Sequence, residues 1–227
     1  MSIGASTALT MNQLAKEAAP YDLNVVSNIS IDGDGDIAAY LAKKGAGLDK
    51  YAEKMEQISS YETDLTYGKF FEGQRVELWQ IDEELPEQKI DAFALSDVNK
   101  ALKMQGKKPL TLKEDQYLIN CNYKGTYAYI DTALKLHPEV TINGQVLHRA
   151  SDEVMQDTFI MTSIGNNDRG TLIVPDKIAN GLKKDMNALL VRYKPDVNSN
   201  EVLKKMIPIG LDKTHGYRYA EKNIMYE

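Results

Sequence analysis

Apolar and polar positions along the chain follow two periods, one typical of strands and one typical of helices. Alternating or β-branched runs are separated by stretches in which apolar residues recur every three to four positions. Three times, a strand pattern leads into a helix pattern and then into another strand pattern. In order, the units are 21–27, 36–44 and 57–71; then 89–96, 96–106 and 115–125; then 171–175, a helix opening at Asp176, and 187–194.

Further elements surround these units. The stretch 57–71 alternates well enough for one long strand or two short ones. The remaining predictions are a helix over 6–18, a strand over 75–81, a polar loop over 82–89, a helix over 198–207 and a polar, aromatic tail over 216–227.

Asn143 and Gly144 stand between two alternating runs, "EVTI" and "QVLHRA". A type I′ turn needs positive φ at both central positions, which Asn and Gly tolerate best. This pair therefore predicts a β-hairpin over 139–150, inserted between the second and third units.

Recurring strand–helix–strand units with an inserted hairpin predict an α+β or mixed α/β domain. The 227 residues suffice for one large domain or two small lobes. We expect a single domain over 1–227, because no low-complexity segment and no Gly/Ser linker divides the chain. An internal boundary is weakly marked, with candidate lobes over 20–131 and 160–227 and the hairpin insertion over 132–159.

The ends of the second helix carry recognisable signals. Ser96 stands at its start, where a side-chain oxygen can accept a hydrogen bond from an orphan backbone N–H. Gly106 is expected to adopt the left-handed conformation that stops the helix, and Pro109 follows it.

Composition narrows the class of protein. The formal net charge is −6, which argues against a nucleic-acid binder, since that class carries a basic patch. Apolar residues make up 43%, enough for a packed core. No apolar run is long enough to cross a bilayer, and the first residues lack a signal-peptide pattern. Taken as a whole chain, the sequence therefore predicts a cytosolic protein.

The stretch "DGDGD" at 32–36 resembles the start of a calcium loop. Such a loop needs acidic residues at positions 1, 3 and 5, Gly at position 6 and Glu at position 12. Counting from Asp32, the acidic positions fit, but position 6 is Ile37 and position 12 is Lys43. A lysine repels calcium, so the closing ligand is missing and a metal site is disfavoured. A phosphate cradle fails as well, because the carboxylates would repel the anion.

Helix capping explains the same residues better. Asp34 or Asp36 can accept from orphan N–H groups at the start of the helix, where negative charge is favoured. Lys43 and Lys44 fall in the last turn, where positive charge is favoured, and Gly45 is the expected stop.

No catalytic constellation emerges from the remaining residues. Cys121 lies in an apolar run and is expected to be a small buried residue, since no histidine is positioned to activate it. His137, His148 and His215 are far apart and lack metal-binding spacing. Neither a GxSxG elbow nor a GxGxxG loop occurs. We therefore assign no catalytic residue, no metal and no cofactor.

One polar segment is a candidate recognition loop. Asn166, Asn167, Asp168 and Arg169 precede an apolar strand, and polar loops on rigid scaffolds often carry binding, although an ordinary turn explains them too. Tyrosine is also enriched, with 13 Tyr against 4 Phe. In "NYKGTYAYI", Tyr123, Tyr127 and Tyr129 are expected to be half-buried on one face of a strand rather than to form a ligand platform.

Three segments resemble the large extracytoplasmic domain of FtsX-like, MacB-type ABC transporter permeases of the Gram-positive bacitracin-export type. In that pattern a strand leads into Ser-Asp-x-Asn, an amphipathic helix and Gly-Lys-x-Pro-x-x-Leu. The matching residues are Ser96, Asp97, Asn99, Gly106, Lys107, Pro109 and Leu112. "DRGTLIVPDKIANGL" and "APYDLNVV" resemble two further segments of the same family.

The resemblance implies a different location and role. It implies a domain on the extracytoplasmic face of the cell membrane, held between transmembrane helices of the same permease. Such a domain is not an enzyme, because a separate cytoplasmic ATPase subunit hydrolyses the nucleotide. The implied ligand is a peptide antibiotic or a lipid-carrier complex, in connection with antimicrobial-peptide resistance and often with a sensor histidine kinase as partner.

Two alternatives stay open at this point. The chain fits a stand-alone soluble α/β enzyme with an unrecognised active site, which would need a pocket of polar residues with perturbed pKa values. Within the same family, the domain fits control of lipoprotein or cell-wall hydrolase partners instead of antibiotic handling.

Overall fold

The computed structural model describes residues 21–28, 35–75, 85–121, 124–157, 170–210 and 218–221. The strands are β1 (Leu23–Asn28), β2 (Ala52–Thr66), β3 (Lys89–Ala94), β4 (Gln116–Asn120), β5 (Glu139–Ile142), β6 (Gln145–Arg149), β7 (Thr171–Val174), β8 (Lys183–Tyr193) and β9 (Arg218–Glu221). The α-helices are α3 (Ile37–Lys43), α4 (Tyr67–Phe70), α5 (Leu95–Met104), α6 (Lys124–Leu136), α7 (Asp176–Ala179) and α8 (Ser199–Gly210). Two short 3₁₀ helices are η1 (Leu48–Lys50) and η3 (Leu85–Glu87).

The described strands form one mixed sheet in the order β5-β6-β4-β7-β3-β2-β8-β1-β9. The pairs β3–β7 and β4–β6 are parallel, and the other neighbouring pairs are antiparallel. The three predicted units are present as β1-α3-β2, β3-α5-β4 and β7-α7-β8. The prediction of a mixed α/β fold is thereby confirmed.

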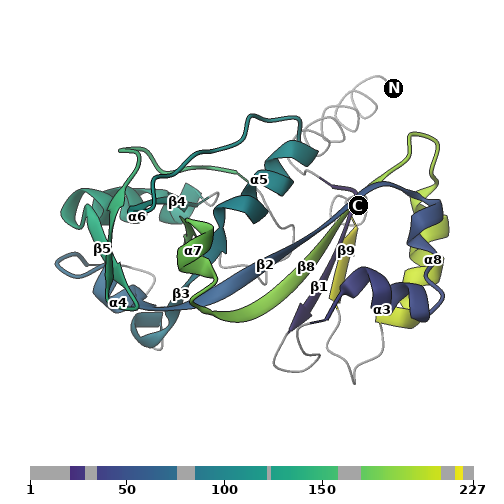
Figure 1. Ribbon diagram of the computed structural model, residues 1–227, viewed down its shortest axis with the longest axis horizontal. Coiled ribbons are helices and arrows are strands. Elements are labelled where there is room, and N and C mark those ends of the chain that lie inside the picture. The colour runs from purple at the N-terminus through teal and green to yellow at the C-terminus, as the bar shows by residue number, and fades with distance from the viewer. Residues whose placement is uncertain are drawn as a thin grey trace, which may run out of the picture.

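The long strands β2 and β8 pair over most of their length and run through the middle of the molecule (Figure 1). At one end of this ribbon lie α4, α6, α7 and the β5–β6 hairpin, and at the other end lie α3 and α8 (Figure 1). The ribbon thus lies between two groups of helices.

Side chains of β8 alternate between two cores. Ala188 and Leu190 pack in the cluster that contains Val98, Ala101 and Leu102 of α5. Leu189 and Val191 pack with Ile37 and Leu41 of α3 and with Val202 of α8. Because successive side chains of a strand point to opposite faces, one apolar run supplies both faces of the sheet.

The hairpin prediction is confirmed in its turn residues. Asn143 has φ 47° and Gly144 has φ 76°, both positive as a type I′ turn requires. The turn is fixed to the end of β2, because the backbone N–H of Asn143 donates to Asp64 Oδ1 at 2.8 Å.

Two predicted strands extend less far than expected. The stretch 57–71 is strand only to Thr66, whose hydroxyl accepts from Lys69 N and caps α4. The stretch 115–125 is strand only to Asn120, and the chain then forms α6. The placement of Tyr127 and Tyr129 on a strand was therefore wrong. Both are half-buried helical residues packed against the core. At helical spacing, Tyr127 shares a face with Ile130 and Leu134, and Tyr129 lies one turn before Ala133.

The predicted capping role of Ser96 was also wrong. Strand β3 continues to Ala94, which is the N-cap residue, so Ser96 already lies in the first turn of α5. The predicted helix over 6–18 and residues 76–81 of the predicted strand lie outside the described residues. Of the predicted tail over 216–227, residues 218–221 form β9.

Candidate functional site

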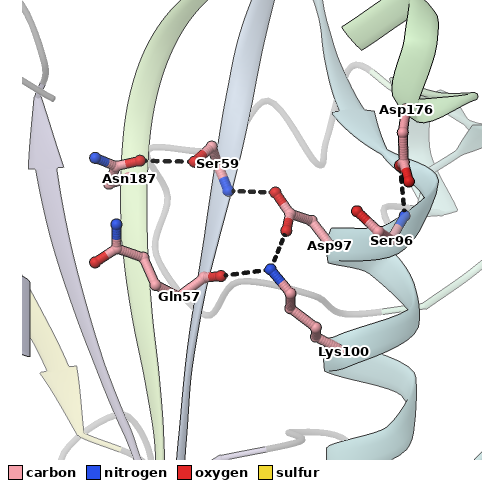
Figure 2. Close-up of polar contacts among 7 residues, drawn as sticks. All are labelled: Gln57, Ser59, Ser96, Asp97, Lys100, Asp176 and Asn187. Atoms are coloured by element: carbon pink, nitrogen blue, oxygen red, sulfur yellow. Dashed lines mark hydrogen bonds and ion pairs between the residues drawn. The ribbon is translucent and has the colours of Figure 1, made fainter. Parts of the chain in front are cut away.

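Asp97, on the first turn of α5, is the centre of a polar network that links this helix to β2. Its side chain is 9% exposed. Asp97 Oδ2 accepts from the backbone N–H of Ser59 at 2.9 Å, and Oδ1 accepts from Lys100 Nζ at 2.7 Å (Figure 2). Lys100 Nζ also donates to the backbone carbonyl of Gln57 at 3.2 Å. The helix therefore binds the strand through one backbone donor and one backbone acceptor.

The edge of β2 explains why these side chains lie there. Strand β2 pairs with β3 only from Ser60 onward, whereas it pairs with β8 from Ala52. Because β3 ends at Ala94 and the chain enters α5, the backbone groups of β2 before Ser60 lose a strand partner on that side. Asp97 and Lys100 replace the missing strand, which leaves fewer buried backbone groups unsatisfied.

The network continues across the sheet to the residues before α3. Ser59 Oγ donates to Asn187 Oδ1 at 2.7 Å, and Asn187 Nδ2 donates to the Gly35 carbonyl at 3.3 Å. Gln57 Nε2 donates to the same carbonyl at 3.3 Å, and its Oε1 accepts from Ile37 N at 2.9 Å. Side chains of β2 and β8 thus hold the start of α3 in place.

The "DGDGD" stretch is part of this architecture. Asp36 Oδ1 accepts from Ala39 N at 3.1 Å, which confirms Asp36 as the cap of α3. Gly45 follows the helix with φ 80°, the left-handed conformation predicted for it. Asp32 and Asp34 lie outside the described residues. The described part of the stretch therefore begins a helix.

Residues of the Ser-Asp-x-Asn pattern have identifiable structural roles. The backbone N–H of Ser96 donates to Asp176 Oδ1 of α7 at 2.9 Å (Figure 2). Asn99 binds both backbone groups of Leu110, donating through Nδ2 at 3.0 Å and accepting through Oδ1 at 2.7 Å. Asn99 therefore holds the loop that follows α5, which Gly106 enters with φ 73°. These residues fix helices α5 and α7, strand β2 and the loop after α5 relative to one another.

Sequence reasoning missed several members of the network. Gln57, Ser59, Lys100 and Asn187 were not predicted to have a role. The available signal was weak: Asn187 opens the apolar run "NALLV", and Ser59 lies within a strand pattern. A polar residue that is fully buried in a central strand needs a partner, and Asn187 finds it in Ser59.

The other candidate residues that the structure describes lie apart from this network. Cys121 is buried as predicted, with its sulfur 3.2 Å from Thr126 Oγ1. The ring of His137 contacts the Glu72 carbonyl at 2.7 Å, and that of His148 lies 3.1 Å from Glu139 Oε1. His215 and the candidate recognition loop of Asn166, Asn167, Asp168 and Arg169 lie outside the described residues.

Three of the side chains that the structure describes illustrate how burial and neighbouring charge shift pKa values. Burial raises the pKa of Tyr117 to about 12. The hydrogen bond from Lys89 lowers the pKa of Glu62 below its ordinary value. Partial burial, reinforced by the charge of Glu62, raises the pKa of Asp185. None of the three belongs to the network around Asp97.

Two solved structures, among others, superpose on this chain with TM-scores below 0.5 and low sequence identity. Neither a protein-family model nor a curated protein matches the chain. A candidate lipoprotein from Bacillus anthracis superposes with a TM-score of 0.42 at 9% identity, covering 87% of this chain and 96% of that one. The periplasmic region of MacB from Actinobacillus actinomycetemcomitans superposes with a TM-score of 0.38 at 11% identity, covering 95% of both chains. Among the described residues, no helix has the length and apolar character needed to cross a membrane.

Proposed function

We propose that the chain is a non-catalytic extracytoplasmic domain of an ABC transporter permease, tethered to the membrane by transmembrane helices of the same protein. In this role it binds a substrate, such as an antimicrobial peptide or a lipid-carrier complex, or transmits movement to partner proteins. A cytoplasmic ATPase subunit supplies the energy, and a sensor histidine kinase is a further candidate partner.

The observation that carries the proposal is that two of the family-like segments form one structural unit. Their strands pair in parallel, with Ala92 opposite Leu172 and Ala94 opposite Val174. The helices that follow are joined by the bond from Ser96 N to Asp176 Oδ1. The two family-like segments therefore contact each other through backbone pairing and a hydrogen bond, although they are about 80 positions apart in sequence.

The arrangement of the outer strands agrees with a tethered domain. In the antiparallel pair β1–β9, Leu23 lies opposite Glu221. The chain therefore enters β1 and leaves β9 at the same end of this strand pair. A domain whose entry and exit lie close together can be inserted between two elements of a larger protein.

Labelling in intact cells tests the proposed topology. Asp196 is exposed in the loop between β8 and α8, so Asp196→Cys in the full-length parent protein supplies a reactive site. A membrane-impermeant maleimide is expected to label this variant from outside. The unmodified parent, whose Cys121 is buried, is the control. Labelling that appears only after cell lysis would contradict the proposal.

The ligand-binding form of the proposal needs separate measurements. Titration with bacitracin or a lantibiotic, with and without undecaprenyl pyrophosphate, tests for substrate binding. Deletion of the domain from the full transporter is expected to abolish resistance to the peptide. Unchanged resistance after deletion would contradict a role in antibiotic handling. It would not bear on the membrane topology, which the labelling experiment tests separately.

A further inference from the structure

A groove of about 340 Å³ lies between β6, α7 and the turn before β4. Val146 of β6 lines one side, Ile178 and Lys177 of α7 line the other, and Glu114 and Asp115 belong to the turn. This volume falls at the lower end of the range of ligand pockets, about 300–1,000 Å³. The groove shares no residue with the network of Gln57, Ser59, Asp97, Lys100 and Asn187.

The groove exists because the sheet is interrupted at this point. Strand β6 pairs with β4 through His148 N, which donates to the Asp115 carbonyl at 2.7 Å, and Ala150 N, which donates to Tyr117 at 2.8 Å. Before Gln116 the chain turns away, and this turn is closed by Gln116 N donating to the Lys113 carbonyl at 3.1 Å. On the side of β6 that faces away from β5, no described strand lies beside Gln145 and Val146.

One backbone unit of β6 is left facing this gap. The amides of alternate residues in a strand point to the same side, so Val146 N–H points the same way as those of His148 and Ala150. Arg149 N donates to the Pro138 carbonyl at 3.0 Å, so the amide of Arg149 points towards β5. The amides of Val146, His148 and Ala150 therefore point away from β5. Within the described part of the chain, the amide and carbonyl of Val146 have no hydrogen-bond partner. The amide and carbonyl of Val146 are therefore available to pair with the backbone of an added strand.

The side chains around this position favour a particular kind of occupant. Val146 is 49% exposed, one of few large apolar side chains so exposed among the described residues. Ile178, at 8% exposure, supplies a second apolar surface across the groove. An occupant that covers both would bury apolar area in addition to making backbone hydrogen bonds.

The charges at the rim are mainly negative. Glu114 Oε2 and Lys177 Nζ lie 3.3 Å apart, but both side chains are highly exposed, so this pair is weak. Asp115 adds a second, exposed carboxylate close by. Two carboxylates face one ammonium group, which favours a basic side chain on the occupant.

We propose that this groove binds an extended peptide segment that adds a strand beside Val146 and places a basic side chain near Asp115. Strand addition of this kind gains affinity from main-chain hydrogen bonds and specificity from pockets for alternate side chains. The occupant is a free, extended peptide that carries at least one basic residue. The inference goes beyond the proposed function and holds whether or not the chain belongs to a permease.

Selection from a library of phage-displayed random heptapeptides on the full chain tests the proposal. Enriched peptides are expected to contain Lys or Arg together with β-branched residues. The corresponding synthetic peptides should shift the amide resonance of Val146 in a ¹H–¹⁵N spectrum. N-methylation of the peptide at the pairing position should weaken binding about tenfold, the effect of losing about 1.4 kcal/mol.

Two charge variants complete the test. Asp115→Lys is expected to weaken binding of the basic peptides about tenfold, because it reverses a charge at the rim. Asp196→Lys makes the same exchange on an exposed loop elsewhere and should leave binding unchanged. Circular dichroism checks that both variants are folded.

Several results would overturn the inference. These are a selection that enriches no peptide over wells without protein, resonance shifts confined to residues outside the groove, and equal binding of N-methylated and unmodified peptides. The topology of the parent protein does not enter this experiment, so the groove and the permease proposal can fail independently.

Discussion

The carboxylate of Asp97 accepts a hydrogen bond from the backbone N–H of Ser59 at 2.9 Å, so a helical side chain satisfies the edge of a strand. The same carboxylate holds Lys100 at 2.7 Å, and Lys100 in turn binds the Gln57 carbonyl. A charge that is this well buried is stable only with such partners. Asp97 therefore supplies the central polar contact between α5 and β2.

Asp97→Ala is expected to lower the free energy of unfolding by about 2–4 kcal/mol, because Ser59 N–H loses its acceptor and Lys100 loses its ion-pair partner. Asp97→Asn keeps one acceptor oxygen and should cost about half as much. Urea denaturation measures both, with an unchanged m-value showing that only stability has changed. Asp196→Ala, in an exposed loop, is the control and should stay within about 0.5 kcal/mol. Equal stability of Asp97→Ala and the parent would contradict the role given to Asp97.

Asp176→Ala is expected to destabilise the chain by about 1 kcal/mol, since Ser96 N–H then loses the acceptor that joins α5 to α7. Asp176→Asn retains an oxygen at the same place and should recover most of the loss. Ser96→Ala should have little effect, because the backbone of Ser96 makes the bond. A larger loss for Ser96→Ala than for Asp176→Ala would show that the serine side chain is the cap after all.

Local features of the fold were predictable from the sequence, whereas its long-range polar contacts were not. The Asn143-Gly144 turn is specified by the φ preferences of two adjacent residues, so the hairpin followed directly. The start of α5 depends on how far β3 stays paired with β7, and that pairing joins residues about 80 positions apart. Ser96 was therefore assigned a capping role that Ala94 and Asp176 share instead.

The ambiguity at α6 has a physical origin as well. Tyr127 and Tyr129 alternate as in a strand, but Tyr127, Ile130 and Leu134 also share one face of a helix. Only the packing of Ile130 and Leu134 in the core decides between the two periods. The network around Asp97 also depends on tertiary structure, because Ser59 and Asn187 come into contact only when β2 and β8 are paired.

Two buried asparagines allow a matched test of hydrogen bonding. Asn24 and Asn120 are both fully buried. Neither side-chain atom of Asn24 has a partner among the described residues, and its neighbours in the sheet, Leu190 and Ala220, are apolar. Asn120 binds both backbone groups of Asp157, at 2.9 and 2.8 Å. The two side-chain amides are therefore equally buried, but only that of Asn120 has hydrogen-bond partners among the described residues.

Asn24→Leu is expected to raise the free energy of unfolding by about 1 kcal/mol, because it removes an unsatisfied buried amide. Asn120→Leu should lower it by about 2 kcal/mol, because it leaves two backbone groups of Asp157 without their partner. Thermal and urea unfolding of both variants give the comparison. A loss of stability in Asn24→Leu as large as that in Asn120→Leu would indicate that the Asn24 amide binds a group that the described residues do not include.

Asp185 makes stability depend on pH in a direction opposite to most carboxylates. It is the extra residue of a bulge in β8, between Lys184 opposite Tyr61 and Met186 opposite Ser60. Partial burial, with the charge of Glu62 nearby, raises the pKa of Asp185 above its ordinary value of 3.8, while Lys183 opposes the shift. Between the ordinary and the raised pKa, the folded state binds more protons than the unfolded state. Its contribution to stability therefore falls as pH rises through that window.

Asp185→Asn is accordingly expected to be more stable than the parent at pH 7, and this advantage should shrink as pH falls through the raised pKa towards 3.8. Urea unfolding at a series of pH values from 7 to 3 measures the difference. Asp196→Asn controls for the change in net charge, because it removes an exposed carboxylate from the loop between β8 and α8. Glu62→Gln removes the neighbouring charge and should reduce the advantage of Asp185→Asn when the two changes are combined. A difference in free energy of unfolding between Asp185→Asn and the parent that grows as the pH falls would contradict the raised pKa of Asp185.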